Sequence, residues 1–122
     1  LQEASAIALA YAAQSNYYAE LTALYQAKRD LLLHSLHEAG LETLTPQGTY
    51  FAMVKIDTLD FANDVDFCRY LTIDIGVAAI PPSAFYHNPA DGAGLTRFAF
   101  CKSDEVLLEA ARRLLKLRGM ED

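Results

Sequence analysis

The chain has 122 residues, with ten Lys and Arg against sixteen Asp and Glu, so its formal net charge is −6. This size fits one domain, and we expect residues 1–122 to form a single one. The acidic balance and the lack of a basic, aromatic-rich stripe exclude nucleic acid as an expected partner, and the lack of an apolar run of about 20 residues excludes a membrane span.

The two cysteines, Cys68 and Cys101, are far apart in the sequence and belong to no CxxC or Cys/His cluster. This spacing disfavours a zinc site or a disulfide framework, so we expect no metal. No targeting pattern is present either, and the sequence therefore predicts a cytoplasmic protein with reduced thiols.

The first part of the chain is helical in pattern. Residues 3–14 are rich in Ala, Ile and Leu and predict a largely buried helix. Ser15 and Asn16 interrupt it, and a second helix with apolar residues at helical spacing follows until Gly40 ends it. Because the chain enters its first helix without Met or a capping residue, we expect further residues before Leu1 in the natural protein.

A turn at residues 45–48 precedes a largely apolar stretch, residues 49–56, that predicts a strand. Asn63 and Asp64 are typical of a helix start, and that helix is expected to end at Gly76.

Short strands dominate the next part. Residues 77–80 are apolar and are followed by two prolines, which predicts a strand that ends there. After a polar loop at residues 87–94, residues 95–102 predict another strand. A final helix is expected from Asp104 to Arg118, closed by Gly119, with acidic residues in its first turn and basic residues towards its end.

The resulting order is helix, helix, strand, helix, strand, strand, helix. Segregated helices with few strands predict an α+β fold: a two-layer sandwich in which a small mixed sheet of about three strands packs against helices.

Arg97 lies in the middle of the strand expected at residues 95–102. Strand alternation places it on the face opposite Phe98 and Phe100, beside only the small residues Ala99 and Cys101. A cation in that position calls for an anion, which is either a structural carboxylate of this chain or a bound ligand.

Familiar catalytic patterns do not fit. Ser83 lies outside any Gly-x-Ser-x-Gly motif, and residues 45–50 lack the glycine spacing and lysine of a phosphate loop. His34 and His37 share a helix face but have no acidic or cysteine companion, so we expect them to be solvated; His87 has no visible partner.

Four short segments stand out together: residues 25–30 (YQAKRD), 47–51 (QGTYF), 76–86 (GVAAIPPSAFY) and 97–105 (RFAFCKSDE). In order and spacing they resemble one family, the C-terminal small domain of pyridoxal-phosphate-dependent aminotransferases of class I/II. They are most similar to the branch that contains methionine and kynurenine (glutamine) aminotransferases.

This resemblance implies that Arg97 holds the α-carboxylate of the substrates. It also implies that Tyr50, Phe51 and Phe85 line an apolar pocket for methionine-like or aromatic side chains. The residues alone leave other roles open, since strand alternation directs either Tyr50 or Phe51 into the core and Phe85 could be a loop anchor.

The resemblance further implies an enzyme that moves an amino group between an amino acid and a 2-oxo acid, with pyridoxal phosphate as cofactor and a homodimer as its intact form. The lysine that binds the cofactor would belong to an absent large domain, because Lys28, Lys55, Lys102 and Lys116 match no cofactor-lysine motif. No catalytic or cofactor-binding residue is therefore expected in the segment, which alone should be inactive.

A second hypothesis is a free-standing, non-enzymatic module that binds amino acids or mediates dimerisation, with a split β-α-β fold. Such a module would bind amino acids without any upstream segment, which the first hypothesis does not predict.

Overall fold

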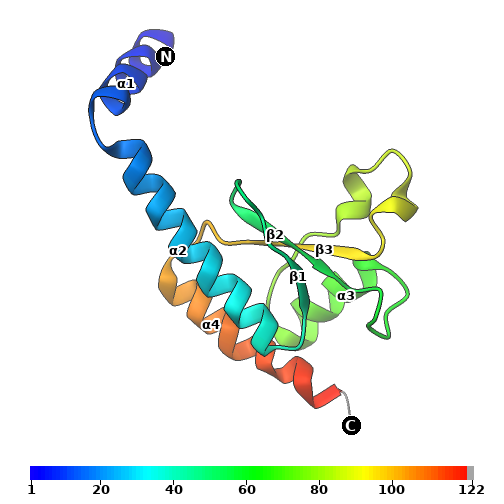
Figure 1. Ribbon diagram of the computed structural model, residues 1–122. Helices are drawn as coiled ribbons and strands as arrows, with labels where there is room; N and C mark the ends of the chain where they lie inside the picture. Colours follow the sequence, from blue (N-terminus) through cyan, green and yellow to red (C-terminus); the bar gives the residue numbers. More distant parts are fainter. Residues whose placement is uncertain (121–122) are drawn as a thin grey trace.

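The computed structural model describes the backbone of residues 1–120 (Figure 1). It contains helices of three kinds and three strands, in the order α1 (Gln2–Gln14), α2 (Tyr17–Glu38), β1 (Glu42–Leu44), β2 (Phe51–Lys55), α3 (Asp64–Tyr70), η1 (Leu71–Ile75), η2 (Pro82–Phe85), η3 (Pro89–Asp91), β3 (Leu95–Ala99), α4 (Asp104–Leu114) and η4 (Leu115–Met120). Here η1 is a π-helix, and the other η elements are 3₁₀ helices.

The sheet has three strands in the order β1-β2-β3. Both pairings are antiparallel, with Thr43 opposite Val54 and Met53 opposite Arg97. The α+β class with a small three-stranded sheet is thus confirmed. The expected mixed sheet is wrong, since every strand pairing in the described part of the chain is antiparallel.

The strand expected at residues 77–80 is reduced to one bridge between Ile80 and Arg97. Two features prevent a longer pairing. The N–H of Val77 donates to the carbonyl of Leu71 and so closes the preceding π-helix, while the prolines at residues 81 and 82 offer no donor.

The third strand is instead β1, which the sequence pattern did not reveal. It is a short edge strand whose outer residues, Glu42 and Leu44, are exposed. An ion pair supports the register of β1 on β2, because Glu42 lies opposite Lys55 and pairs with it.

One face of the sheet is buried against the helices. Ala52 and Val54 of β2 and Thr96 and Phe98 of β3 point into a core to which α2, α3 and α4 contribute. The alternate residues of β2 and β3, including Arg97, are half-buried on the opposite face. Figure 1 shows α2 and α4 side by side across the sheet, with the η2–η3 loop near β3.

The predicted helix boundaries in the middle of the chain are confirmed. Gly40 adopts a φ of 84° after α2, and the N–H of Leu41 donates to the carbonyl of Leu36, which is a Schellman-type stop. Asn63 caps α3, since its side chain accepts from the N–H of Asp66 at 3.0 Å.

The last helix departs from the prediction, because α4 ends at Leu114 and a 3₁₀ segment continues to Met120. Gly119 therefore lies within that segment and closes no α-helix. Leu114 and Leu117 are both buried, and a spacing of three residues aligns side chains in a 3₁₀ helix.

The prediction of a largely buried first helix is wrong. In α1 only Ala12 is buried, while Ile7, Leu9 and Tyr11 are between 62% and 73% exposed. The helix extends away from the rest of the fold (Figure 1). Its apolar composition therefore led to a wrong prediction of burial. No helix within residues 1–120 is long and apolar enough to cross a membrane.

Candidate functional site

Arg97 is fixed by its backbone on both sides. Within the sheet it lies opposite Met53 of β2. On its other side it exchanges two hydrogen bonds with Ile80, each with an N to O distance of 3.0 Å. Its backbone is therefore held by neighbours on both edges, while its side chain lies on the half-buried face.

The guanidinium of Arg97 lies between two aromatic rings. Its Cζ atom is 4.9 Å from the ring centre of Phe51 and 5.1 Å from that of Phe85. No carboxylate within residues 1–120 comes within 4.0 Å of it, so the structural ion pair considered as one alternative is not formed there. Both contacts are of the cation–π kind, in which the ring attracts the positive charge but supplies no carboxylate to neutralise it.

Tyr50 and Phe51 do not divide between core and site as strand alternation predicts. Thr49 has a φ of 66°, which is rare for a side-chain-bearing residue and turns the backbone just before β2. The strand begins only at Phe51, so Tyr50 is 50% exposed and Phe51 is half-buried on the face of Arg97. Their rings make an edge-to-face contact with centres 5.5 Å apart. Neither ring enters the core. The side chains of β2 that do so are Ala52 and Val54.

Phe85 reaches Arg97 from the η2 helix. Pro81 and Pro82 lead into this helix, and their fixed φ angles restrict the loop that carries the ring. Phe85 is 68% exposed, so it is not a buried loop anchor. The structure thus brings Arg97, Phe51 and Phe85 together and places Tyr50 at their edge.

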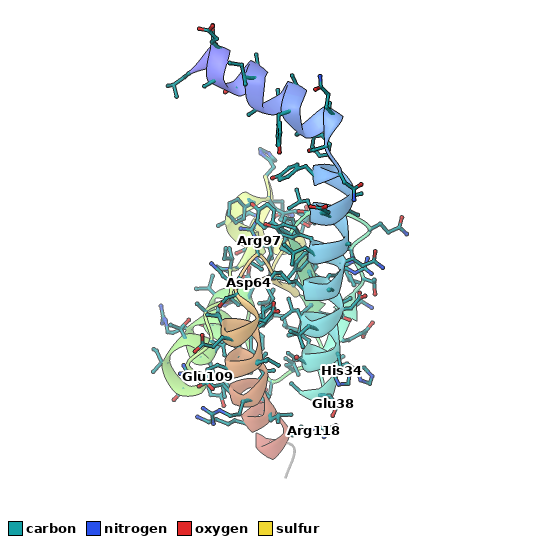
Figure 2. The ribbon with its side chains drawn as sticks, turned by 90° about the vertical axis from the view of Figure 1, so that its left-hand side faces the viewer. His34, Glu38, Asp64, Arg97, Glu109 and Arg118 are labelled. Atoms are coloured by element: carbon teal, nitrogen blue, oxygen red, sulfur yellow. The ribbon has the colours of Figure 1, made fainter. Side chains whose placement is uncertain are left out.

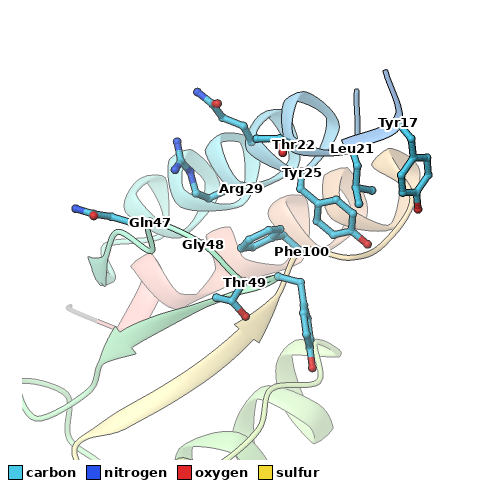
Figure 3. A pocket seen from close by; sticks show the side chains of 11 residues that line it. Tyr17, Leu21, Thr22, Tyr25, Arg29, Gln47, Gly48, Thr49 and Phe100 are labelled. Carbon is cyan, nitrogen blue, oxygen red and sulfur yellow. The ribbon is translucent and has the colours of Figure 1, made fainter. Parts of the chain in front are cut away.

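A hollow of about 560 Å³ lies next to this cluster, between α2 and the turn before β2 (Figure 3). Its lining includes Tyr50, which therefore borders both the hollow and the Arg97 cluster. The sequence did not assign the other lining side chains to a site, although the matched segment 25–30 contributes three of them. These others are Tyr17, Leu21, Thr22, Tyr25, Gln26, Arg29, Gln47, Gly48, Thr49 and Phe100.

Two lysines are held in structural contacts. Lys28 donates to the Lys102 carbonyl at 2.6 Å and to Asp104 at 2.7 Å. Lys55 pairs with Glu42, whose hydrogen bond and charge raise the pKa of that lysine. The other two lysines also lie outside the Arg97 cluster. Lys102 lines a second hollow, next to α4, and Lys116 lies in η4.

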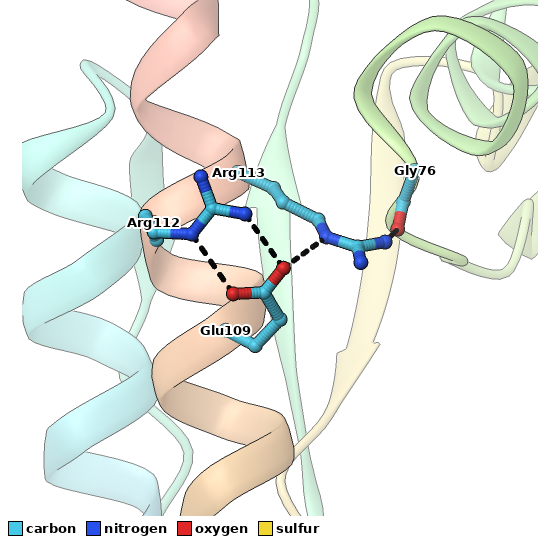
Figure 4. Close-up of polar contacts among 4 residues, drawn as sticks. All are labelled: Gly76, Glu109, Arg112 and Arg113. Carbon is cyan, nitrogen blue, oxygen red and sulfur yellow. Dashed lines mark hydrogen bonds and ion pairs between the residues drawn. The ribbon is translucent and has the colours of Figure 1, made fainter.

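Charged side chains of α4 hold the segment that leads towards Phe85 (Figure 4). Arg113 donates to the Gly76 carbonyl at 2.8 Å and to Glu109 at 2.7 Å. Glu109 also accepts two bonds from Arg112, and these donors lower the pKa of Glu109 from 4.5 to about 2. The C-terminal helix is thereby linked to the start of residues 76–86.

The histidines lie apart from this cluster. His34 and His37 are exposed, as predicted, and Figure 2 shows His34 and Glu38 near the C-terminal end of α2, away from Arg97. Within residues 1–120 no three His, Cys, Asp or Glu side chains are grouped to hold a metal ion.

These motifs and this fold are those of an aminotransferase. The family model for class I and II aminotransferases matches residues 1–114, so the chain belongs to the class I and II aminotransferase family. The family implies pyridoxal phosphate as its cofactor.

Curated proteins with similar sequences are also aminotransferases. The chain is 41% identical to a kynurenine–oxoglutarate transaminase of Dictyostelium discoideum, over 96% of this chain and 31% of the relative. It is 42% identical to a methionine aminotransferase of Escherichia coli, over 86% of this chain and 27% of the relative. The chain thus spans about a third of the length of these relatives.

Solved structures agree. The methionine aminotransferase YbdL of Escherichia coli superposes with a TM-score of 0.79 at 40% identity, covering 89% of this chain and 29% of that one. The N-succinyldiaminopimelate aminotransferase of Mycobacterium tuberculosis superposes with a TM-score of 0.81 at 39% identity, covering 93% and 29%.

Proposed function

We propose that this chain is the C-terminal, substrate-clamping domain of an aminotransferase that moves an amino group between an amino acid and a 2-oxo acid. The observation that carries the proposal is the position of Arg97. Its guanidinium lies over two aromatic rings on the half-buried face of the sheet and forms no ion pair with a carboxylate in the described residues.

In this role Arg97 binds the α-carboxylate that every such substrate carries. A guanidinium presents two parallel N–H donors to a carboxylate, which fixes the orientation of the anion as well as attracting it. The rings of Phe51 and Phe85 restrict the side chain before substrate arrives, so less conformational freedom is lost on binding.

Tyr50, Phe51 and Phe85 would form the apolar side of the substrate pocket. Such a wall suits methionine-like or aromatic side chains, because these gain from contact with aromatic faces. The relatives named for methionine and kynurenine are consistent with this preference.

The cofactor would be bound outside this segment. Lys28 and Lys55 are held in ion pairs, and the described residues place no lysine in the Arg97 cluster. The chain matches only about a third of the relatives' length, and the remaining two thirds of these relatives are long enough for a large domain that binds pyridoxal phosphate. On this proposal residues 1–122 are one domain, the segment alone is inactive, and the complete enzyme is a homodimer; the free thiols Cys68 and Cys101 support a cytoplasmic location.

The proposal is tested by Arg97→Ala in the complete protein that contains this segment. Losing a bidentate, charge-assisted pair should lower kcat/KM by about 100-fold or more, for amino acids and for 2-oxo acids alike. Arg97→Lys should recover little of the loss, since an ammonium does not present a planar pair of donors. Arg118→Ala is the matched control, because that side chain is exposed in η4 and forms none of the ion pairs of the described residues. Unchanged kinetics of Arg97→Ala would refute the assignment.

The alternative, an amino-acid-binding module, is tested on residues 1–122 alone. Calorimetric titration with methionine and with phenylalanine should show no binding at micromolar concentrations if the segment supplies only the clamp. Micromolar binding would favour the module.

A further inference from the structure

Asp64 is a buried carboxylate that the proposed function does not use. It is the first residue of α3 and only 1% exposed. Burying a carboxylate is costly unless it is hydrogen-bonded, so its partner in the fold is informative.

That partner is the backbone of the loop that carries Phe85. Oδ2 of Asp64 accepts a hydrogen bond from the N–H of Ser83 at 2.8 Å. Ser83 is the second residue of η2, and the first N–H groups of a helix have no acceptor within the helix. Asp64 therefore supplies the acceptor that ties η2 to α3.

Gly92, the residue that follows η3, packs against the backbone of Ser83. A Cβ atom at Gly92 would lie 2.8 Å from the backbone nitrogen of Ser83 and 2.9 Å from its Cα. No side chain fits in that gap, because backbone atoms cannot move aside as a flexible side chain can. Ser83 is thus fixed between the carboxylate of α3 and the glycine that follows η3.

The segment before Ser83 is fixed by Arg97 itself through the paired backbones of Ile80 and Arg97. Phe85 follows Ser83 by two residues, and its ring lies 5.1 Å from the Arg97 Cζ atom. The path of this short loop therefore sets where the ring meets the guanidinium.

We propose that Asp64 is a positioning residue for the carboxylate clamp: through the Ser83 N–H it holds Phe85 against Arg97. This inference rests on the proposed function, in which Arg97 binds the substrate carboxylate. Asp64 contacts no substrate in this scheme and acts only through the loop.

The kinetic test uses Asp64→Ala and Asp64→Asn in the complete protein. Asp64→Ala removes the acceptor, and the lost ring contact should raise KM for the amino acid about two- to fivefold while kcat changes less. Asp64→Asn retains an oxygen that can accept from Ser83 and should restore most of the affinity. Asp66→Ala is the control, since this exposed aspartate lies on the same helix and makes no bond to the loop.

A second pair of variants approaches Ser83 from the other side and leaves Asp64 intact. Gly92→Ala should displace the loop and raise KM as Asp64→Ala does. Gly94→Ala should not, because its added Cβ would meet only the Asp57 Cβ at 3.7 Å. If Asp64→Ala fails to fold, as judged by circular dichroism, the comparison of the glycine variants decides the question.

A spectroscopic measurement separates the two proposals. Ring currents of Phe51 and Phe85 should shift the Arg97 Nε–H signal in ¹⁵N-arginine spectra, with Arg97→Lys identifying the signal. Asp64→Ala should move it towards the position of a solvated arginine. If it stays in place and KM is unchanged in folded Asp64→Ala and Gly92→Ala, the positioning role is refuted. If instead Arg97→Ala leaves the kinetics unchanged, it is the proposed function that fails, whatever the spectra show.

Discussion

Ile80 and Arg97 are joined by a reciprocal pair of backbone hydrogen bonds at 3.0 Å, the only bridge from residues 77–80 to the sheet within the described chain. The residue that begins the Pro-Pro-Ser loop is thus registered directly on the arginine that the loop later covers with Phe85. This pair of bonds therefore fixes where the loop leaves the sheet relative to Arg97.

If the proposed function holds, replacing Phe85 with Leu should weaken substrate binding without changing the fold. Leu retains apolar bulk but has no ring face for the guanidinium, and a cation–π contact at an exposed position contributes about 0.5–1 kcal/mol. In the complete enzyme we expect KM for the amino acid to rise about two- to fivefold. Steady-state kinetics check this, and circular dichroism of the variant should match that of the parent. A KM equal to that of the parent would show that the ring does not contribute.

The sequence predicted most of the fold because its strongest signals are local. Gly40 and Asn63 mark helix ends through backbone freedom and side-chain capping, and both operate as expected. β1 was missed because three residues are too few to show a period, and its register depends on a partner, Lys55, that is distant in the sequence. The exposure of α1 was missed because composition reports how apolar a helix is, not what covers it.

For the site, the sequence placed Arg97 on the correct face because alternation needs only a regular strand. It could not place Tyr50, because the positive φ of Thr49 interrupts the alternation and no residue type announces that conformation. The contact between Phe85 and Arg97 was not predicted: the resemblance implied only that both residues belong to the substrate site, and their contact depends on a tertiary loop path.

Lys28 should contribute to stability through a backbone carbonyl more than through its ion pair. Its ammonium donates to the Lys102 carbonyl at 2.6 Å and to Asp104 at 2.7 Å, and its side chain is only 14% exposed. We expect Lys28→Met to lower the free energy of unfolding by about 1–2 kcal/mol. Asp104→Asn should cost less than about 1 kcal/mol, because that carboxylate is 72% exposed. Urea denaturation measures both, and equal losses would contradict this ranking.

The two cysteines should differ sharply in reactivity. Cys68 is buried, and burial raises the pKa of its thiol; the hydrogen bond to Thr96 opposes part of this rise, and the charge of Asp64 adds a still smaller increase. A raised pKa leaves less thiolate at neutral pH, whereas Cys101 is exposed. Brief treatment with iodoacetamide should therefore modify Cys101 alone, as read by peptide mass spectrometry. Both should react in denaturant, and rapid modification of Cys68 in the folded chain would contradict the prediction.

Glu109 should make the stability of the chain depend on pH in the acidic range. Hydrogen bonds donated by Arg112 and by Arg113 lower the pKa of Glu109 to about 2, whereas in the unfolded chain this pKa is near 4.5. Between these values the unfolded carboxyl takes up a proton that the folded one does not, so the stabilisation is complete above about pH 4.5 and is lost as pH falls to about 2.

Glu109→Gln tests this directly, because the amide cannot ionise. Its melting temperature should lie below that of the parent at about pH 7, and the difference should shrink between about pH 4.5 and pH 2, the window set by the two pKa values. The effect should be small, since Glu109 is 42% exposed and solvent screens its charge. Glu38→Gln provides the matched control, because Glu38 is exposed and forms none of the ion pairs of the described residues. A difference that is constant across this range would show that Glu109 acts through packing or hydrogen bonding that does not require its charge.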